Sequence, residues 1–162
     1  MSLKIEFKGN EVNIKKFLNI NEKINTFTLV NSSLEEVSLE TLLDKPLVIS
    51  TIPSIDTGVC AKQSIELTKL SAKYKDYKFI TVSLDLPFAA SRWCEANNSN
   101  MNFLSDYKYK NFTNDLGFEL SNLGLLTRSV LIIGKDQHIK YIQYVKEVTN
   151  EPNYQELESF IN

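Results

Sequence analysis

Apolar and polar residues alternate along several short segments of the chain, which is the pattern of β-strands with one buried face. Two hairpins are predicted in the N-terminal part, one over residues 3–14 and one over 27–39. A third hairpin is predicted in the C-terminal part, where strands 130–133 and 139–145 flank the polar turn 134–137. The pattern therefore predicts antiparallel pairing toward both ends of the chain.

The middle of the chain has a different pattern. Segments 47–52 and 79–84 are nearly continuous apolar runs, which is typical of strands buried on both faces. Between them a helix is predicted over 58–75, with a stripe facing the core at positions 63, 67, 70 and 74. This strand–helix–strand order implies two parallel strands joined by a right-handed crossover.

Shorter elements complete the prediction. Helices are expected over 88–97, 109–116 and 154–160, and a strand over 103–105. A βαβ half followed by a ββα half, behind an N-terminal β-hairpin extension, is the order of the thioredoxin fold. We therefore predict an α/β fold with a central mixed sheet flanked by helices. No repeat, linker or low-complexity segment divides the chain, so residues 1–162 are expected to form a single domain.

Composition restricts the partners and the compartment. Hydrophobic residues make up 43% of the 162 residues and charged residues 23%, as in ordinary soluble proteins. A net charge of −2 gives no electrostatic reason to expect nucleic acid or a membrane surface as a partner. The chain contains no apolar run of about 18 residues and no signal-peptide hydrophobic region at its start, so a cytoplasmic protein is expected.

Metal ions and other cofactors are not expected either. One histidine and two cysteines that lie far apart in the sequence do not supply a plausible zinc site. The five glycines form neither a phosphate-binding loop nor a dinucleotide fingerprint.

Cys60 is the first candidate for chemistry. The strand at 47–52 leads through Pro53 and Thr57 to this cysteine, in the first turn of the predicted helix. Unpaired backbone N–H groups and the positive end of the helix dipole meet there, and such surroundings favour a nucleophilic thiolate. A free cysteine is also often a small buried apolar residue, so its position alone leaves both interpretations open.

Longer stretches of sequence carry a resemblance to a known family. The spacing of Pro53, Thr57 and Cys60 resembles the P-x-x-x-T-x-x-C signature of peroxiredoxins. The thiol peroxidase branch of that family is resembled by P-S-I-D-T-G-V-C at 53–60, S-L-D-L-P-F-A-A-S-R-W-C at 83–94, L-S-D-Y at 104–107, L-L-T-R-S-V at 125–130 and E-V-T-N-E-P-N-Y at 147–154. The resemblance covers essentially the whole chain and implies a thioredoxin fold of the peroxiredoxin type and a thiol-dependent peroxidase.

The resemblance also implies roles for individual residues. Cys60 attacks a hydroperoxide and becomes a sulfenic acid, and Cys94 resolves it by forming an intramolecular disulfide. The Thr57 hydroxyl can accept a hydrogen bond from the peroxide proton and donate one toward the sulfur. Arg128 supplies a positive charge, and Pro53, which has no N–H, shapes the loop. The implied substrates are hydrogen peroxide and organic hydroperoxides, the reductant is a thioredoxin-like protein, and the assembly is a homodimer.

Each of these residues also has an ordinary structural explanation. These explanations are a helix N-cap for Thr57, a strand-end proline for Pro53, a surface arginine for Arg128, a buried helix cysteine for Cys94, and a turn or cap residue for Asp85. Two other functions stay open. A disulfide oxidoreductase is disfavoured because the chain has no C-x-x-C motif, and a redox sensor would use the Cys60–Cys94 disulfide as a switch.

Overall fold

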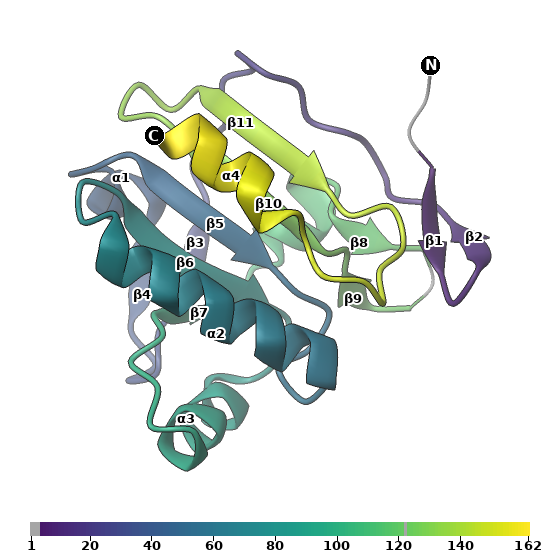
Figure 1. Cartoon of the computed structure of the whole chain (residues 1–162), viewed down its shortest axis with the longest axis horizontal. Helices are drawn as coiled ribbons and strands as arrows, with labels where there is room; N and C mark the ends of the chain where they lie inside the picture. Colours follow the sequence, from purple (N-terminus) through teal and green to yellow (C-terminus); the bar gives the residue numbers. More distant parts are fainter. Residues whose placement is uncertain (1–3, 122) are drawn as a thin grey trace.

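A computed structural model describes residues 4–121 and 123–162, so Leu3 of the first predicted strand lies outside the described residues. The main strands are β3 (Thr28–Val30), β4 (Glu36–Ser38), β5 (Leu47–Thr51), β6 (Lys78–Ser83), β7 (Phe103–Ser105), β10 (Ser129–Ile133) and β11 (Ile139–Tyr144). They form one seven-stranded sheet in the order β11-β10-β5-β6-β7-β3-β4 (Figure 1).

The sheet is mixed, as predicted. The neighbours β5, β6 and β7 run parallel, and the other pairs are antiparallel. The helices are α1 (Leu39–Leu42), α2 (Gly58–Lys73), α3 (Pro87–Ala96) and α4 (Tyr154–Ile161). Helix α2 joins the parallel strands β5 and β6, so the predicted crossover is confirmed. Among the described residues, no helix is long and apolar enough to cross a membrane.

The predicted N-terminal hairpin is also present. Its strands are β1 (Ile5–Phe7) and β2 (Asn10–Val12), which pair antiparallel. Lys8 and Gly9 connect them with φ angles of 53° and 81°. Two consecutive residues with positive φ are typical of the tight turn that matches the twist of a hairpin.

Other segments differ from the prediction. The expected helix over 109–116 is a single π-helical turn, η1 (Asn111–Asp115). The buried Asp106 carboxylate accepts hydrogen bonds from the N–H groups of Phe112 and Thr113, which fixes this turn, and burial raises the pKa of Asp106. Strands β8 (Glu119–Leu120) and β9 (Leu125–Leu126) and the one-turn helix α1 were not predicted, because elements this short show no periodicity.

Both faces of the sheet are covered. Helices α2 and α4 lie side by side on one face (Figure 1), where Leu67, Leu70 and Leu157 pack on Val48, Val130 and Ile132. The alternate strand residues point to the opposite face, where Leu47, Ile49, Leu131 and Ile133 join a cluster with Phe27, Phe112 and Phe118. Irregular segments of the chain, rather than long helices, therefore cover this second face.

The sheet brings two segments that are distant in the sequence to the same end of its central strands. Strand β5 ends at Thr51, and the next residues form the loop that leads into α2. In the antiparallel pair of β5 and β10, Ser129 lies opposite Thr51. Arg128 precedes Ser129, so it lies at the end of the strands from which the loop and the first turn of α2 continue.

Candidate active site

Cys60 lies in the first turn of α2 as predicted, and its side chain is fully buried. Thr57 is the N-cap of this helix, with φ −105° and ψ 152°, and its hydroxyl accepts a hydrogen bond from the Cys60 N–H at 3.3 Å. The N-cap interpretation of Thr57 is therefore correct. Its expected contact with a peroxide stays a prediction.

Arg128 is buried, with 2% of its surface exposed, so the surface-arginine interpretation is wrong. Its guanidinium donates three hydrogen bonds: Nη2 to Cys60 Sγ at 3.3 Å, Nη1 to Gln63 Oε1 at 2.8 Å, and Nε to the Val148 carbonyl at 2.7 Å. A buried charge is tolerated only with such partners. Two neutral acceptors therefore fix the orientation of Arg128 so that its third contact reaches the sulfur.

Gln63 and Val148 were missed as site residues by the sequence analysis. Gln63 is fully buried, and its Nε2 donates to Ser50 Oγ at 2.6 Å, which leaves Oε1 free to accept from Arg128. Its signal in the sequence is a polar residue at a position predicted to face the core. Val148 acts through its backbone carbonyl, and no side-chain pattern encodes that contact.

Asp85, which was predicted to be a turn or cap residue, lies at a bend and binds a neighbouring loop. Helix α3 is capped by Leu86 without a side-chain hydrogen bond, so the cap interpretation of Asp85 is wrong. Its carboxylate instead accepts hydrogen bonds from Ser54 Oγ and from the Ile55 N–H, both at 2.8 Å. Asp85 thereby ties the loop between β5 and α2 to the end of β6.

A cavity of about 400 Å³ opens beside the guanidinium of Arg128. Three of the residues predicted from the sequence line it, namely Pro53, Thr57 and Arg128. The rest of its wall comes from Phe7, Lys8, Ser54, Gly58, Val59, Leu125, Val148 and Thr149. Thr57 and Arg128, the second of which also contacts Cys60, thus line the same largely apolar cavity.

Cys94 lies outside this group. It is a partly buried residue of α3 and opens into a second cavity, of about 320 Å³, beside Asn31, Ser99 and Phe103. Its neighbour Trp93 packs instead against the cluster that contains Cys60. Burial raises the pKa of the Cys94 thiol, and a hydrogen bond with Ser99 partly lowers it. The structure therefore brings Pro53, Thr57, Cys60 and Arg128 together, while both cysteines stay free.

Known proteins resemble this chain over nearly its whole length. The profile of the Redoxin family matches residues 19–157. The thiol peroxidase of Bacillus subtilis (strain 168) is 40% identical over 153 residues, which cover 93% of this chain and 92% of that protein. The thiol peroxidase of Clostridium acetobutylicum is 35% identical over 157 residues, which cover 96% of this chain and 95% of that protein.

Solved structures agree with the fold. The crystal structure of a peroxiredoxin-like protein from Aquifex aeolicus has a TM-score of 0.90 and 32% sequence identity, and the match covers 99% of this chain and 96% of that one. A thiol peroxidase from Chromobacterium violaceum has a TM-score of 0.88 at 15% identity, with 99% and 96% covered. At that identity the second match supports the fold alone.

Proposed function

Because this chain belongs to the Redoxin family and is a thiol-dependent peroxidase of the thiol peroxidase type, we propose that Cys60 is the residue that attacks the peroxide. The observation that carries the proposal is the 3.3 Å hydrogen bond from Arg128 Nη2 to Cys60 Sγ. A thiolate is the reactive form of cysteine, and a permanent cation at the sulfur supports it. The roles proposed for Thr57, Arg128 and Pro53 are supported by the cavity that the three residues line.

The proposed first step is an in-line displacement. The Cys60 thiolate attacks one oxygen of the hydroperoxide, so an S–O bond forms while the O–O bond breaks. The departing oxygen takes a proton and leaves as water or as an alcohol, and Cys60 becomes a sulfenic acid. Donors aimed at the developing negative charge supply most of such an acceleration, and Arg128 is the donor proposed here. The Thr57 hydroxyl, which donates to the Ser54 carbonyl at 3.3 Å in the reduced form, is proposed to accept the hydrogen bond of the peroxide O–H. Pro53 offers no N–H that could compete for the sulfur.

The proposed second step uses Cys94. Its thiol condenses with the sulfenic acid of Cys60, which forms the disulfide and releases water. A dithiol protein of the thioredoxin type then reduces the disulfide by thiol–disulfide exchange. The raised pKa of the Cys94 thiol keeps it mainly protonated, and so a weak nucleophile, in the reduced form. Cys94 lines a cavity beside α3 whereas Cys60 is fully buried in the first turn of α2, so their reaction is proposed to require a rearrangement that brings the two sulfur atoms together.

That rearrangement gives a testable expectation. A disulfide needs the two Cα atoms within about 7 Å. In the reduced form Cys60 is enclosed in an apolar cluster, whereas Cys94 lines a cavity beside α3. We expect the first turn of α2 or the helix α3 to unwind on oxidation. Hydrogen exchange followed by mass spectrometry should show faster exchange over 56–64 and 88–98 in the oxidised protein, while β5 stays protected. Equal protection of both segments in the two forms would contradict a cycle that depends on unwinding.

Cys94→Ser separates the two thiols by role. This variant should react with one equivalent of peroxide at nearly the wild-type rate, because the attack needs only the groups around Cys60. Its sulfenic acid should persist, and excess peroxide should oxidise it to the irreversible sulfinic and sulfonic acids. Intact mass should show a gain of one oxygen and then more, whereas the oxidised wild type should lose two hydrogens. A disulfide-linked dimer of the oxidised wild type would place the bond between chains and contradict the intramolecular cycle.

Three further expectations stay predictions. A homodimer is supported by the exposed apolar side chains Leu86 and Phe88 at the start of α3, which are 51% and 60% exposed. A cytoplasmic location is supported by two free cysteines, which fit a reducing compartment. The third is that residues 1–162 form one domain.

A further inference from the structure

The N-terminal hairpin forms part of the cavity beside Arg128. Its residues Phe7 and Lys8 line that cavity. In Figure 1 the hairpin stands at the edge of the molecule, next to the segment that connects β11 to α4. Backbone hydrogen bonds join the two: the Glu6 N–H donates to the Lys146 carbonyl at 2.7 Å, and the Val148 N–H donates to the Glu6 carbonyl at 2.8 Å.

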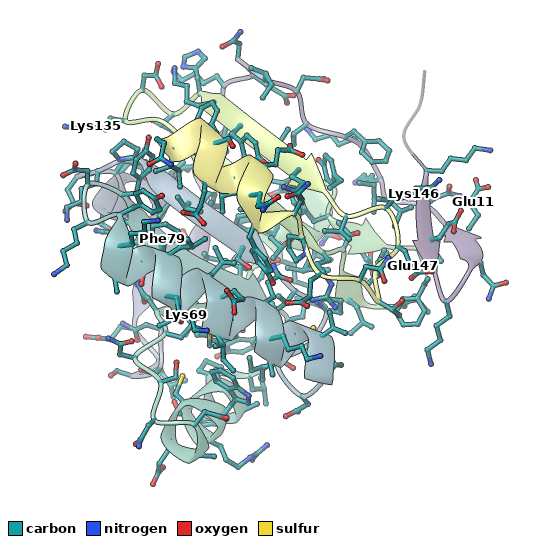
Figure 2. All side chains as sticks on the ribbon, in the orientation of Figure 1. Glu11, Lys69, Phe79, Lys135, Lys146 and Glu147 are labelled. Atoms are coloured by element: carbon teal, nitrogen blue, oxygen red, sulfur yellow. The ribbon has the colours of Figure 1, made fainter. Side chains whose placement is uncertain are left out.

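Glu147 ties the turn of the hairpin to this segment (Figure 2). Its carboxylate accepts hydrogen bonds from the N–H groups of Lys8 at 3.1 Å and Gly9 at 2.8 Å. It also accepts from the N–H and the hydroxyl of Thr149, at 3.0 and 2.9 Å. These four bonds hold the pKa of Glu147 at about 2, so the carboxylate is ionised at neutral pH.

The same short segment reaches the reacting groups. Val148 follows Glu147, and its carbonyl accepts the hydrogen bond from Arg128 Nε. Thr149 lines the cavity with Phe7 and Lys8. Residues 147–149 therefore connect the hairpin, the cavity wall and the guanidinium within three positions of the chain.

We infer that Glu147 is a positioning residue that holds the hairpin as the outer wall of the peroxide cavity. In this role it sets how well the enzyme uses hydroperoxides with an apolar organic group, relative to hydrogen peroxide. The inference rests on the proposed function, because the peroxide must enter the cavity beside Arg128. Glu147 acts through Phe7 and Lys8 and does not touch the reacting atoms.

The two peroxides differ in what they require from the cavity. Hydrogen peroxide needs only the sulfur and hydrogen bonds with Thr57 and Arg128. A hydroperoxide with an organic group must also place that group against the walls. Loss of one apolar contact in such a site changes the specificity by about 10- to 200-fold. Displacement of the hairpin should therefore affect the organic substrate and spare the small one.

The experiment compares Glu147→Ala, Glu147→Gln and Phe7→Ala with Glu11→Gln as the control. Glu11 lies on the same hairpin but is exposed, and the ion pair that it forms with Lys4 is 4.0 Å long. The rate constants for oxidation of Cys60 by cumene hydroperoxide and by hydrogen peroxide are measured by stopped flow for each full-length variant. Circular dichroism verifies that each variant is folded.

In Glu147→Ala the rate constant for cumene hydroperoxide, divided by that for hydrogen peroxide, should fall by about tenfold. The rate constant for hydrogen peroxide itself should be nearly unchanged. Phe7→Ala should lower the ratio in the same direction, because it removes the wall directly. Glu147→Gln should keep part of the wild-type ratio, since its amide oxygen still accepts hydrogen bonds, and Glu11→Gln should keep all of it.

Two outcomes would overturn the inference. Equal losses of rate with both peroxides would mean that Glu147 acts through Arg128 or through stability. An unchanged ratio in Glu147→Ala and Phe7→Ala would mean that the hairpin is not part of the wall that contacts the substrate. If Glu147→Ala does not fold, Glu147→Gln and Phe7→Ala decide by the same ratio. Failure of the proposed function would look different, because Cys60 of the wild-type protein would then react with neither peroxide.

Discussion

Cys60→Ser should have no measurable peroxidase activity. A serine hydroxyl is not ionised at neutral pH, so it cannot attack the O–O bond as a thiolate does. The substitution replaces one small side chain by another in the first turn of α2, where Thr57 still caps the helix, so the fold should be retained. Peroxide consumption with a thioredoxin system, followed by stopped flow and compared with the wild type, tests this expectation.

The other cysteine provides the matched control for this experiment. Cys94→Ser changes the same atom on α3, and it should still consume one equivalent of peroxide. If Cys60→Ser instead keeps substantial activity, Cys60 is not the nucleophile and the proposed chemistry at this site is wrong. If Cys94→Ser does not consume the first equivalent of peroxide although Cys60 is intact, the attack has been assigned to the wrong cysteine.

Arg128→Ala should have the second largest effect. It removes the donor that contacts the Cys60 sulfur and faces the cavity where the peroxide is expected. Loss of one such donor costs about 2–4 kcal/mol of activation free energy, which is roughly a 30- to 1,000-fold lower rate. The rate of Arg128→Lys should lie between those of the wild type and Arg128→Ala, because lysine keeps the charge but cannot make the same three directed hydrogen bonds. Single-turnover oxidation of Cys60 measures the effect.

Arg128→Ala should also lower the free energy of unfolding. It leaves Gln63 Oε1 and the Val148 carbonyl without this buried donor, and an unsatisfied buried group costs about 1–3 kcal/mol. Chemical unfolding therefore has to accompany the kinetics. Arg92→Ala is the matched control, since Arg92 is an exposed arginine of α3 and its loss should change neither quantity. Equal losses of rate in both arginine variants would argue against a specific role of Arg128.

The local parts of the site could be predicted from the sequence. The apolar run of β5, the residues of the loop and the N-cap of α2 follow one another within 47–60, so their arrangement follows from local preferences. The position of Arg128 depends instead on the pairing of Ser129 with Thr51, which no periodicity predicts. The motif around Arg128 indicated its role but not this pairing. The family resemblance supplied what local patterns could not, and it favoured a peroxidase over a disulfide oxidoreductase or a redox sensor.

Contacts through the backbone and single polar residues in the core escaped prediction. The carbonyl of Val148 and the N–H groups that bind Glu147 have no side-chain signature. Gln63 was placed on a buried helical stripe without a reason for its polarity. Asp85 was predicted to be a turn or cap residue, and its contact with the loop before α2 was not predicted. In each case the partner lies far along the chain, so only the folded structure shows which groups meet.

The partners of Arg128 have a consequence for the direction of the cycle. Gln63 and the Val148 carbonyl are neutral, and none of the ion pairs formed by the described residues includes Arg128. In the proposed reaction, the reactive thiolate of Cys60 is then the counter-ion of the buried guanidinium. Oxidation to a sulfenic acid or a disulfide neutralises the sulfur. The buried cation then has no counter-ion, which costs on the order of several kcal/mol of free energy. Entry of water restores the solvation of the cation, so the reaction itself should create the electrostatic force that opens the first turn of α2.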